Sequence, residues 1–155
     1  MICTTLNFPK LIHQLEQDEG CMYEIYLYHL GNPTFGIGHL IDDDEPEYWQ
    51  EVGTPVGRAR VHEAFEADVQ EAMRQCAKLY KAYDWDEFPG EVKSILINMM
   101  FNLGYGNLQK FRKMNSALNM HNWEGAAVEG RDSLWYTQVP NRAERLMSRM
   151  ELVGE

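Results

Sequence analysis

From Arg60 onward, apolar side chains recur at helical spacing, and this pattern constrains the fold more than any other feature of the chain. Over residues 61–80 they form a single apolar face, which predicts one long helix. The segment Val92–Leu103 is apolar on nearly every side, which predicts a central, buried helix. Shorter helices are expected near residues 108–119, 123–130 and 140–150.

The first forty residues have a different character. Residues 9–20 predict a short helix, because Pro9 suits its first turn and Gly20 ends it. Residues 21–40 are dense in Tyr, Ile, Thr and Phe and contain the turn sequence Gly31-Asn32-Pro33, which predicts a β-hairpin or small sheet. The chain is therefore expected to be α+β, with a small N-terminal β lobe and a larger helical lobe joined by a long helix.

Length and composition favour one domain with a real core. The chain has 155 residues and is 45% hydrophobic, which is enough to bury a core. We expect a single domain over 1–155, with a β lobe at 20–59 and a helical lobe from 1–19 and 60–155. The sequence has no run of eighteen apolar residues, and we expect no secretory signal, because residues 1–8 lack a basic region followed by an apolar stretch. Its three cysteines, Cys3, Cys21 and Cys76, show no metal-binding spacing and are expected to be reduced.

The charge of −10 is distributed unevenly along the chain. Residues 1–72 carry 3 basic and 14 acidic side chains, a charge of −11, whereas residues 73–155 carry 11 and 10, a charge of +1. An acidic half repels phosphate backbones, which argues against nucleic acid as a partner. It would also be repelled by an anionic cell wall.

One acidic residue stands where glycosidic chemistry could use it. Cleavage of a glycosidic bond needs a carboxylic acid beside the leaving oxygen, and an inverting enzyme adds a second carboxylate that activates water. Glu19 lies where the first helix runs into the hairpin, and Thr34 lies on the returning strand. By itself this signal is weak, because the chain has 24 acidic residues and most of them are surface charges.

Several short sequence motifs strengthen the case for Glu19 as a catalytic acid. Asp18-Glu19-Gly20, Ile25-Tyr26 and Thr34-Phe35-Gly36-Ile37-Gly38-His39-Leu40 resemble the phage-type lysozymes of glycoside hydrolase family 24. The resemblance continues, in family order, through Ala67-Asp68-Val69, Leu96–Gly104, Ala126-Ala127-Val128, Trp135-Tyr136 and Pro140–Arg145. It covers nearly the whole chain and implies a lysozyme-like fold.

The resemblance also implies roles for individual residues. Glu19 matches the catalytic proton donor, Thr34 the threonine that holds the attacking water, and Arg142 the arginine that pairs with the catalytic glutamate. His39 and Asp68 match a supporting histidine–aspartate pair. Leu40, Phe101 and Asn102 match positions that line the saccharide groove.

The chain departs from the family at the second carboxylate, where Tyr28 replaces the expected aspartate. A phenol ionises only at about pH 10, so it is a poor general base. Strand alternation turns Tyr28 to the same side as Tyr26 and Leu30. Four interpretations remain open: weak hydrolysis through Thr34 and water, another acid reaching the site (Glu24 or one of Asp42, Asp43 and Asp44), lytic transglycosylation with Glu19 alone, or a fold that only binds glycan or a protein partner.

Two further differences concern the first half of the chain. The segment between His39 and Asp68 is shorter than in the family, so the sheet lobe should be trimmed. The acidity is also unlike that of lysozymes that act freely on anionic walls.

The resemblance implies a muramidase that cleaves the β-1,4 bond between N-acetylmuramic acid and N-acetylglucosamine, acting as a monomeric phage endolysin on bacterial peptidoglycan. It implies no metal, no cofactor and no membrane insertion. An endolysin of this kind would be made in the host cytoplasm and released by a holin.

Overall fold

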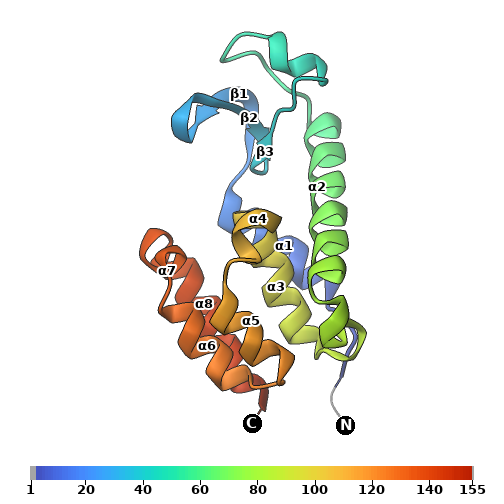
Figure 1. The fold of residues 1–155 in the computed structure, drawn as a ribbon. Helices are drawn as coiled ribbons and strands as arrows, with labels where there is room; N and C mark the ends of the chain where they lie inside the picture. Colours follow the sequence, from blue (N-terminus) through green and yellow to red (C-terminus); the bar gives the residue numbers. More distant parts are fainter. Residues whose placement is uncertain (1–2, 155) are drawn as a thin grey trace. The chain divides into compact units, whose positions relative to one another are not determined.

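The computed structural model describes residues 3–154, whose helices and strands are shown in Figure 1. The longer elements are α1 (Phe8–Glu19), β1 (Met22–Tyr28), β2 (Asn32–Gly36), β3 (His39–Leu40), α2 (Arg58–Leu79), α3 (Gly90–Leu103), α4 (Tyr105–Leu108), α5 (Arg112–Asn119), α6 (Trp123–Arg131), α7 (Leu134–Gln138) and α8 (Pro140–Glu151). Short 3-10 helices are η1 (His29–Gly31), η2 (Pro46–Trp49), η3 (Lys81–Tyr83), η4 (Trp85–Glu87) and η5 (Leu152–Gly154). The fold is therefore α+β, as the sequence predicts.

The described residues form two compact units. The smaller unit runs from Ile12 to Glu71, and the larger combines the residues through Leu11 with those from Ala72 onward. The residues of each unit contact mainly one another in space. The predicted lobe bounds at 20 and 59 stay a prediction. Within residues 3–154, no helix has the length and apolar character needed to span a membrane.

The sheet of the smaller unit has three antiparallel strands in the order β1–β2–β3. Its turn comes earlier than predicted, because η1 makes the turn and Asn32 and Pro33 already belong to β2. The register pairs Tyr28 with Asn32 and Tyr26 with Thr34, while Glu24 forms an isolated bridge with Pro55. The predicted hairpin is thus confirmed and extended on both sides.

The core of the smaller unit joins the sheet to the first part of α2. Ile25, Phe35 and Val61 are almost completely buried. Gly36 ends β2 with φ of 66°, and a β-carbon there would lie 3.0 Å from Cγ1 of Val61. Glycine is required at this point because a side chain would be both strained and crowded.

The larger unit is built around α3, whose residues Ile95, Leu96 and Met99 have no exposed surface. Helices α4 and α8 pack against α3, and α6 packs against both α5 and α8, as Figure 1 shows. This confirms the prediction of a central, buried helix. The predicted apolar face of α2 is also confirmed, because its members Val69, Ala72 and Cys76 are buried.

The structure of the larger unit differs from the prediction at one expected helix and adds another helix. In place of one helix over 108–119 the chain forms α4 and α5, separated by a bend at Phe111. The bend brings the Phe111 ring edge-on to Trp135, with centroids 6.2 Å apart. Helix α7 was not predicted at all. It has five residues and starts where the Ser133 side chain accepts a hydrogen bond from the Tyr136 amide, so it is too short to show a period.

All three cysteines are free, as predicted, and one of them is buried. Cys76 lies in the core of α2, whereas Cys3 and Cys21 are exposed. Burial raises the pKa of the Cys76 thiol, so it stays neutral.

Candidate active site

The site can be built from Glu19, the last residue of α1. The helix ends there because Gly20 takes a left-handed conformation and its amide donates to the Glu16 carbonyl. The Glu19 carboxyl lies against Gly38, where a β-carbon would be only 2.5 Å from Glu19 Oε1. Gly38 also has φ of 65°. The Gly36-Ile37-Gly38 turn therefore makes room for a half-buried carboxyl that sequence reasoning had identified by motif alone.

Thr34 lies in the middle of the sheet and is almost completely buried. It pairs with Tyr26 on β1 and with Leu40 on β3. Its hydroxyl donates a hydrogen bond of 3.0 Å to the carbonyl of Asn32. Because the only proton of this hydroxyl is already committed, Thr34 can act on a water molecule only as an acceptor.

Tyr28 is the last residue of β1 and is half exposed, with 53% of its surface open to solvent. Its pairing with Asn32 puts it on the same sheet face as Tyr26 and Thr34, as strand alternation predicts. Its ring packs against His29, with centroids 4.2 Å apart. The prediction for Leu30 was wrong, because the strand ends at Tyr28 and Leu30 takes a left-handed turn conformation with φ of 62°.

Tyr26 is a residue that sequence reasoning did not assign to the site. Burial raises its pKa, and the negative charge of Glu19 raises it further. The phenol is therefore a neutral donor within electrostatic reach of Glu19. Its cross-strand pairing with Thr34 was the signal that could have found it, but the register is not visible in the sequence.

The other acids considered as a second carboxylate, Glu24, Asp42, Asp43 and Asp44, lie in the smaller unit. Glu24 bridges to Pro55 and its carboxyl lies beside Gly53. Asp42 and Asp44 have carboxylate oxygens within 4.8 Å of those of Glu45, a spacing that could hold a cation. The Glu45 oxygens, however, already accept from His39, from Arg60 and from the Asp42 amide.

His39 and Asp68 are brought together as predicted, with His39 Nδ1 2.7 Å from Asp68 Oδ2. Sequence reasoning missed the second partner, since His39 Nε2 lies 2.9 Å from both carboxylate oxygens of Glu45. Burial by itself lowers the pKa of His39, but the hydrogen bonds and charges of Asp68 and Glu45 outweigh it, so the pKa is raised. Because both ring nitrogens of His39 lie at hydrogen-bond distance from carboxylates, its protonated form is favoured, and the residue links β3, the segment after it and α2.

Arg60 completes this network. It donates to Glu45 at 2.5 Å and to Glu47 at 3.1 Å, and it forms an ion pair of 2.8 Å with Glu63. The hydrogen bond from Arg60 lowers the pKa of Glu47 despite some burial. We call the five residues His39, Glu45, Glu47, Arg60 and Asp68 the histidine clamp.

Three of the predicted residues lie in the larger unit. Arg142 of α8 is buried, and its guanidinium donates to Asn98 Oδ1 at 2.8 Å, a partner not foreseen from the sequence. Asn102 accepts a hydrogen bond of 2.8 Å from the Trp135 indole, which fixes the orientation of its amide. Phe101 lies beside it on α3 and is partly exposed. The pairing of Arg142 with Glu19 and the groove role of Phe101 and Asn102 stay predictions.

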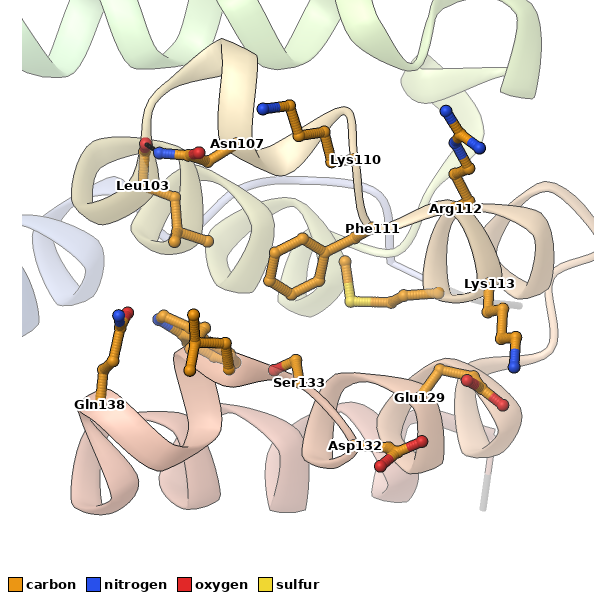
Figure 2. A pocket seen from close by; sticks show the side chains of 13 residues that line it. Leu103, Asn107, Lys110, Phe111, Arg112, Lys113, Glu129, Asp132, Ser133 and Gln138 are labelled. Carbon is orange, nitrogen blue, oxygen red and sulfur yellow. Dashed lines mark hydrogen bonds between the residues drawn. The ribbon is translucent and has the colours of Figure 1, made fainter.

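The larger unit also holds a pocket of about 630 Å³, drawn in Figure 2. Lys110, Arg112 and Lys113 come from the segment around α5, and Glu129 and Asp132 come from the facing end of α6. Phe111 and Trp135 supply its aromatic surface. A pocket with both charge signs around an apolar floor can hold a ligand that carries both kinds of charge.

Comparison with known proteins finds the phage lysozyme family and proteins similar to its members. The model of the phage lysozyme family matches residues 16–150. The chain is 31% identical over 164 residues to "Probable T4-type lysozyme 2" of Dictyostelium discoideum, covering 92% of this chain and 94% of the relative. It is 32% identical over 153 residues to the "Pre-baseplate central spike protein Gp5" of Enterobacteria phage T4, covering 88% of this chain but 27% of that protein. It is 27% identical over 147 residues to the "Peptidoglycan hydrolase gp36" of Pseudomonas phage phiKMV, covering 93% of this chain and 15% of that protein.

Proposed function

Because the chain belongs to the phage lysozyme family, a family of peptidoglycan-degrading glycosidases, we propose that it is a muramidase with Glu19 as its general acid. The bond it cleaves is the β-1,4 linkage between N-acetylmuramic acid and N-acetylglucosamine. The observation that supports this best is the Glu19 carboxyl at the end of α1, held against Gly38 and in the same unit as Thr34. The proposed site on this unit uses a carboxyl acid and a water-orienting hydroxyl.

The first step of this mechanism is proton transfer. Protonated Glu19 donates to the glycosidic oxygen as the bond to the anomeric carbon breaks, and the sugar develops oxocarbenium character. The glutamate that remains is negatively charged. Tyr26 is neutral and within electrostatic reach, so it does not add a second negative charge at this stage.

The second step is the addition of water. Thr34 accepts a hydrogen bond from the water and orients its oxygen toward the anomeric carbon. The family's aspartate would take the other proton, but Tyr28 has no carboxylate. We therefore propose that water addition is the weak step of this enzyme.

The position of Tyr28 favours one alternative reaction. In lytic transglycosylation the 6-hydroxyl of the sugar attacks in place of water, so a single glutamate is enough. Tyr28 is half exposed at the end of β1, and if it replaces the family's base, as the resemblance implies, the lack of a carboxylate there suits this chemistry. A third possibility is a fold that binds glycan or a protein partner without cleaving it.

One experiment distinguishes the three. Purified peptidoglycan is digested with the parent and with Glu19→Gln, and the fragments are analysed by mass spectrometry. Hydrolysis leaves reducing ends, whereas transglycosylation leaves 1,6-anhydro ends that are lighter by one water. A binding protein releases no fragments.

The control is Glu16→Gln, which removes another half-buried acid one turn earlier on α1. We expect no fragments from Glu19→Gln and parental yields from Glu16→Gln. Equal release by Glu19→Gln and the parent would show that the acid lies elsewhere.

The biological setting is a separate proposal. The Dictyostelium relatives are matched along most of their length, whereas the two phage proteins are far longer than the matched segment. We propose that the chain acts on bacterial peptidoglycan after release from the host cell, as an endolysin does.

A further inference from the structure

Trp49, in the smaller unit, is the most exposed aromatic side chain among residues 3–154 and has no role in the mechanism above. It ends η2, and 79% of its surface is open to solvent. Tyr48 meets it edge to face, with ring centroids 5.0 Å apart and planes at 78°. Val52, three residues on, is 59% exposed. A tryptophan exposed to this degree loses the burial that normally stabilises it, so its position calls for an explanation.

The segment that carries Trp49 is tightly held. Successive reverse turns join the Glu45 amide to the Asp42 carbonyl, Tyr48 to Glu45 and Gln50 to Glu47, at 3.0 to 3.1 Å. The Glu45 and Glu47 side chains belong to the histidine clamp described above. The indole is therefore displayed from a rigid support, which reduces the entropy that a ligand would have to remove.

The surroundings of Trp49 are polar and acidic. Asp42, Asp43, Asp44, Gln50 and Glu51 are exposed, and no basic residue occurs from residue 42 to residue 57. The whole smaller unit carries 14 acidic residues and 2 basic ones, Arg58 and Arg60, a charge of −12. Carboxylates and the Gln50 amide are good acceptors for hydroxyl groups, whereas the net charge repels anionic polymers.

These properties match one class of ligand. A pyranose ring has an apolar face of C–H groups, which packs on an aromatic ring, and a rim of hydroxyls, which donate to carboxylates and amides. We infer that Trp49 and Tyr48 form a second glycan-binding surface that takes an uncharged N-acetylhexosamine ring of the wall polymer. It is built from other residues than Glu19, Thr34 and Gly38.

The inference rests on the wall-glycan substrate of the family and not on the assignment of Glu19. Its consequence is retention, because a chain bound at a second point stays close after each cleavage. This would offset the repulsion between an acidic unit and an anionic wall.

The test uses Glu19→Gln, so that the probe is not cleaved. The protein is labelled with ¹⁵N, and the Trp49 indole signal is identified by its disappearance in Trp49→Phe. A hexamer of N-acetylglucosamine is titrated in. We expect the Trp49 indole signal to shift and saturate with a Kd on the order of 1 mM.

A second measurement follows retention on insoluble peptidoglycan. In the Glu19→Gln background, Trp49→Ala should reduce the bound fraction at least about threefold, and Trp49→Phe, which keeps a ring, should retain most of it. The matched control is Met120→Ala, which removes a side chain of 77% exposure from the larger unit and should bind as the parent does.

Three outcomes would overturn the inference. The indole signal does not respond to the sugar, or Trp49→Ala is retained as well as its parent, or the indole responds to hexalysine and not to the sugar, which would assign the surface to a basic polypeptide. If Glu19→Gln still releases fragments, the proposed acid is wrong, but the response of Trp49 can still be measured on ice before cleavage.

Discussion

The Glu19 carboxyl occupies the space that a side chain on Gly38 would need, because a β-carbon there would lie 2.5 Å from Glu19 Oε1. Gly38→Ala would set a β-carbon 2.5 Å from Glu19 Oε1 and force a left-handed conformation on alanine. The backbone strain should cost about 1–2 kcal/mol, and the carboxyl must move. We expect the release of fragments from peptidoglycan to fall at least about tenfold. Circular dichroism should show that the variant still folds.

Gly57→Ala is the matched control for this change. A β-carbon on Gly57 would meet no neighbouring atom within 4 Å, and Gly57 has no left-handed φ. The activity of this variant should equal that of the parent. If Gly38→Ala retains full activity, the close approach of Glu19 to Gly38 has no part in the reaction.

Tyr28→Asp should raise the hydrolytic rate, because it returns a carboxylate to the sheet face that carries Thr34. We expect a gain of about tenfold in reducing ends released from peptidoglycan. Tyr28→Asn is similar in size and polar but has no base, so it should give no gain. Equal rates for the two variants would argue against a missing base and would favour transglycosylation.

The histidine clamp predicts that stability falls as pH rises. The folded-state pKa of His39 is raised above its ordinary value of 6.5, so the folded protein binds the extra proton more tightly than the unfolded chain does. This contribution is fully present below pH 6.5 and is lost as pH rises through the folded pKa. The free energy of unfolding in urea, measured between about pH 6 and pH 9, should therefore decrease.

The variant Glu45→Gln tests whether Glu45 contributes to the raised pKa of His39 and so to the loss of stability at high pH. It removes one of the two charges that hold the imidazolium, so the decrease with pH should become shallower. His62→Gln changes an exposed histidine on the same helix as Asp68 and should leave the slope unchanged. A parental slope in Glu45→Gln would rule out a contribution of Glu45 to the clamp.

Tyr80→Phe should destabilise the larger unit. The buried Tyr80 hydroxyl donates to Asn115 Oδ1 at 2.8 Å, and the Asn115 amide donates to the Leu108 carbonyl at 3.1 Å. Removing the hydroxyl leaves a buried acceptor unsatisfied, which costs about 1–3 kcal/mol. Thermal unfolding should show the loss, whereas Tyr83→Phe, at a partly exposed ring, should change little. An unchanged melting temperature for Tyr80→Phe would contradict this role.

The helices whose apolar residues recur at a regular spacing were predictable from the sequence. Helices α2 and α3 follow directly from apolar spacing, and the hairpin follows from its composition. The bend at Phe111 was not predictable, because no glycine or proline marks it and the contact of its ring with Trp135 exists only in the folded chain. The same holds for α7, which depends on a cap at Ser133.

The assignments of Glu19 and Thr34 to the site come from sequence motifs and stay predictions, whereas the expected contact between His39 and Asp68 is present. Contacts that depend on pairing in space could not be predicted. Glu45 and Arg60 could not be chosen among many charged residues, since nothing in the sequence shows that the turn after Asp42 points back to His39. Tyr26 was missed because its position depends on the strand register.

Tyr28 has one further consequence, which concerns how this protein can change over generations. Its side chain is half exposed at the end of a strand, and its ring contact in the smaller unit is with its neighbour His29. A substitution there removes little packing, and a single base change converts a tyrosine codon into an aspartate codon. On the proposed mechanism, the rate of hydrolysis is thus open to selection at a position where a substitution costs the fold little packing.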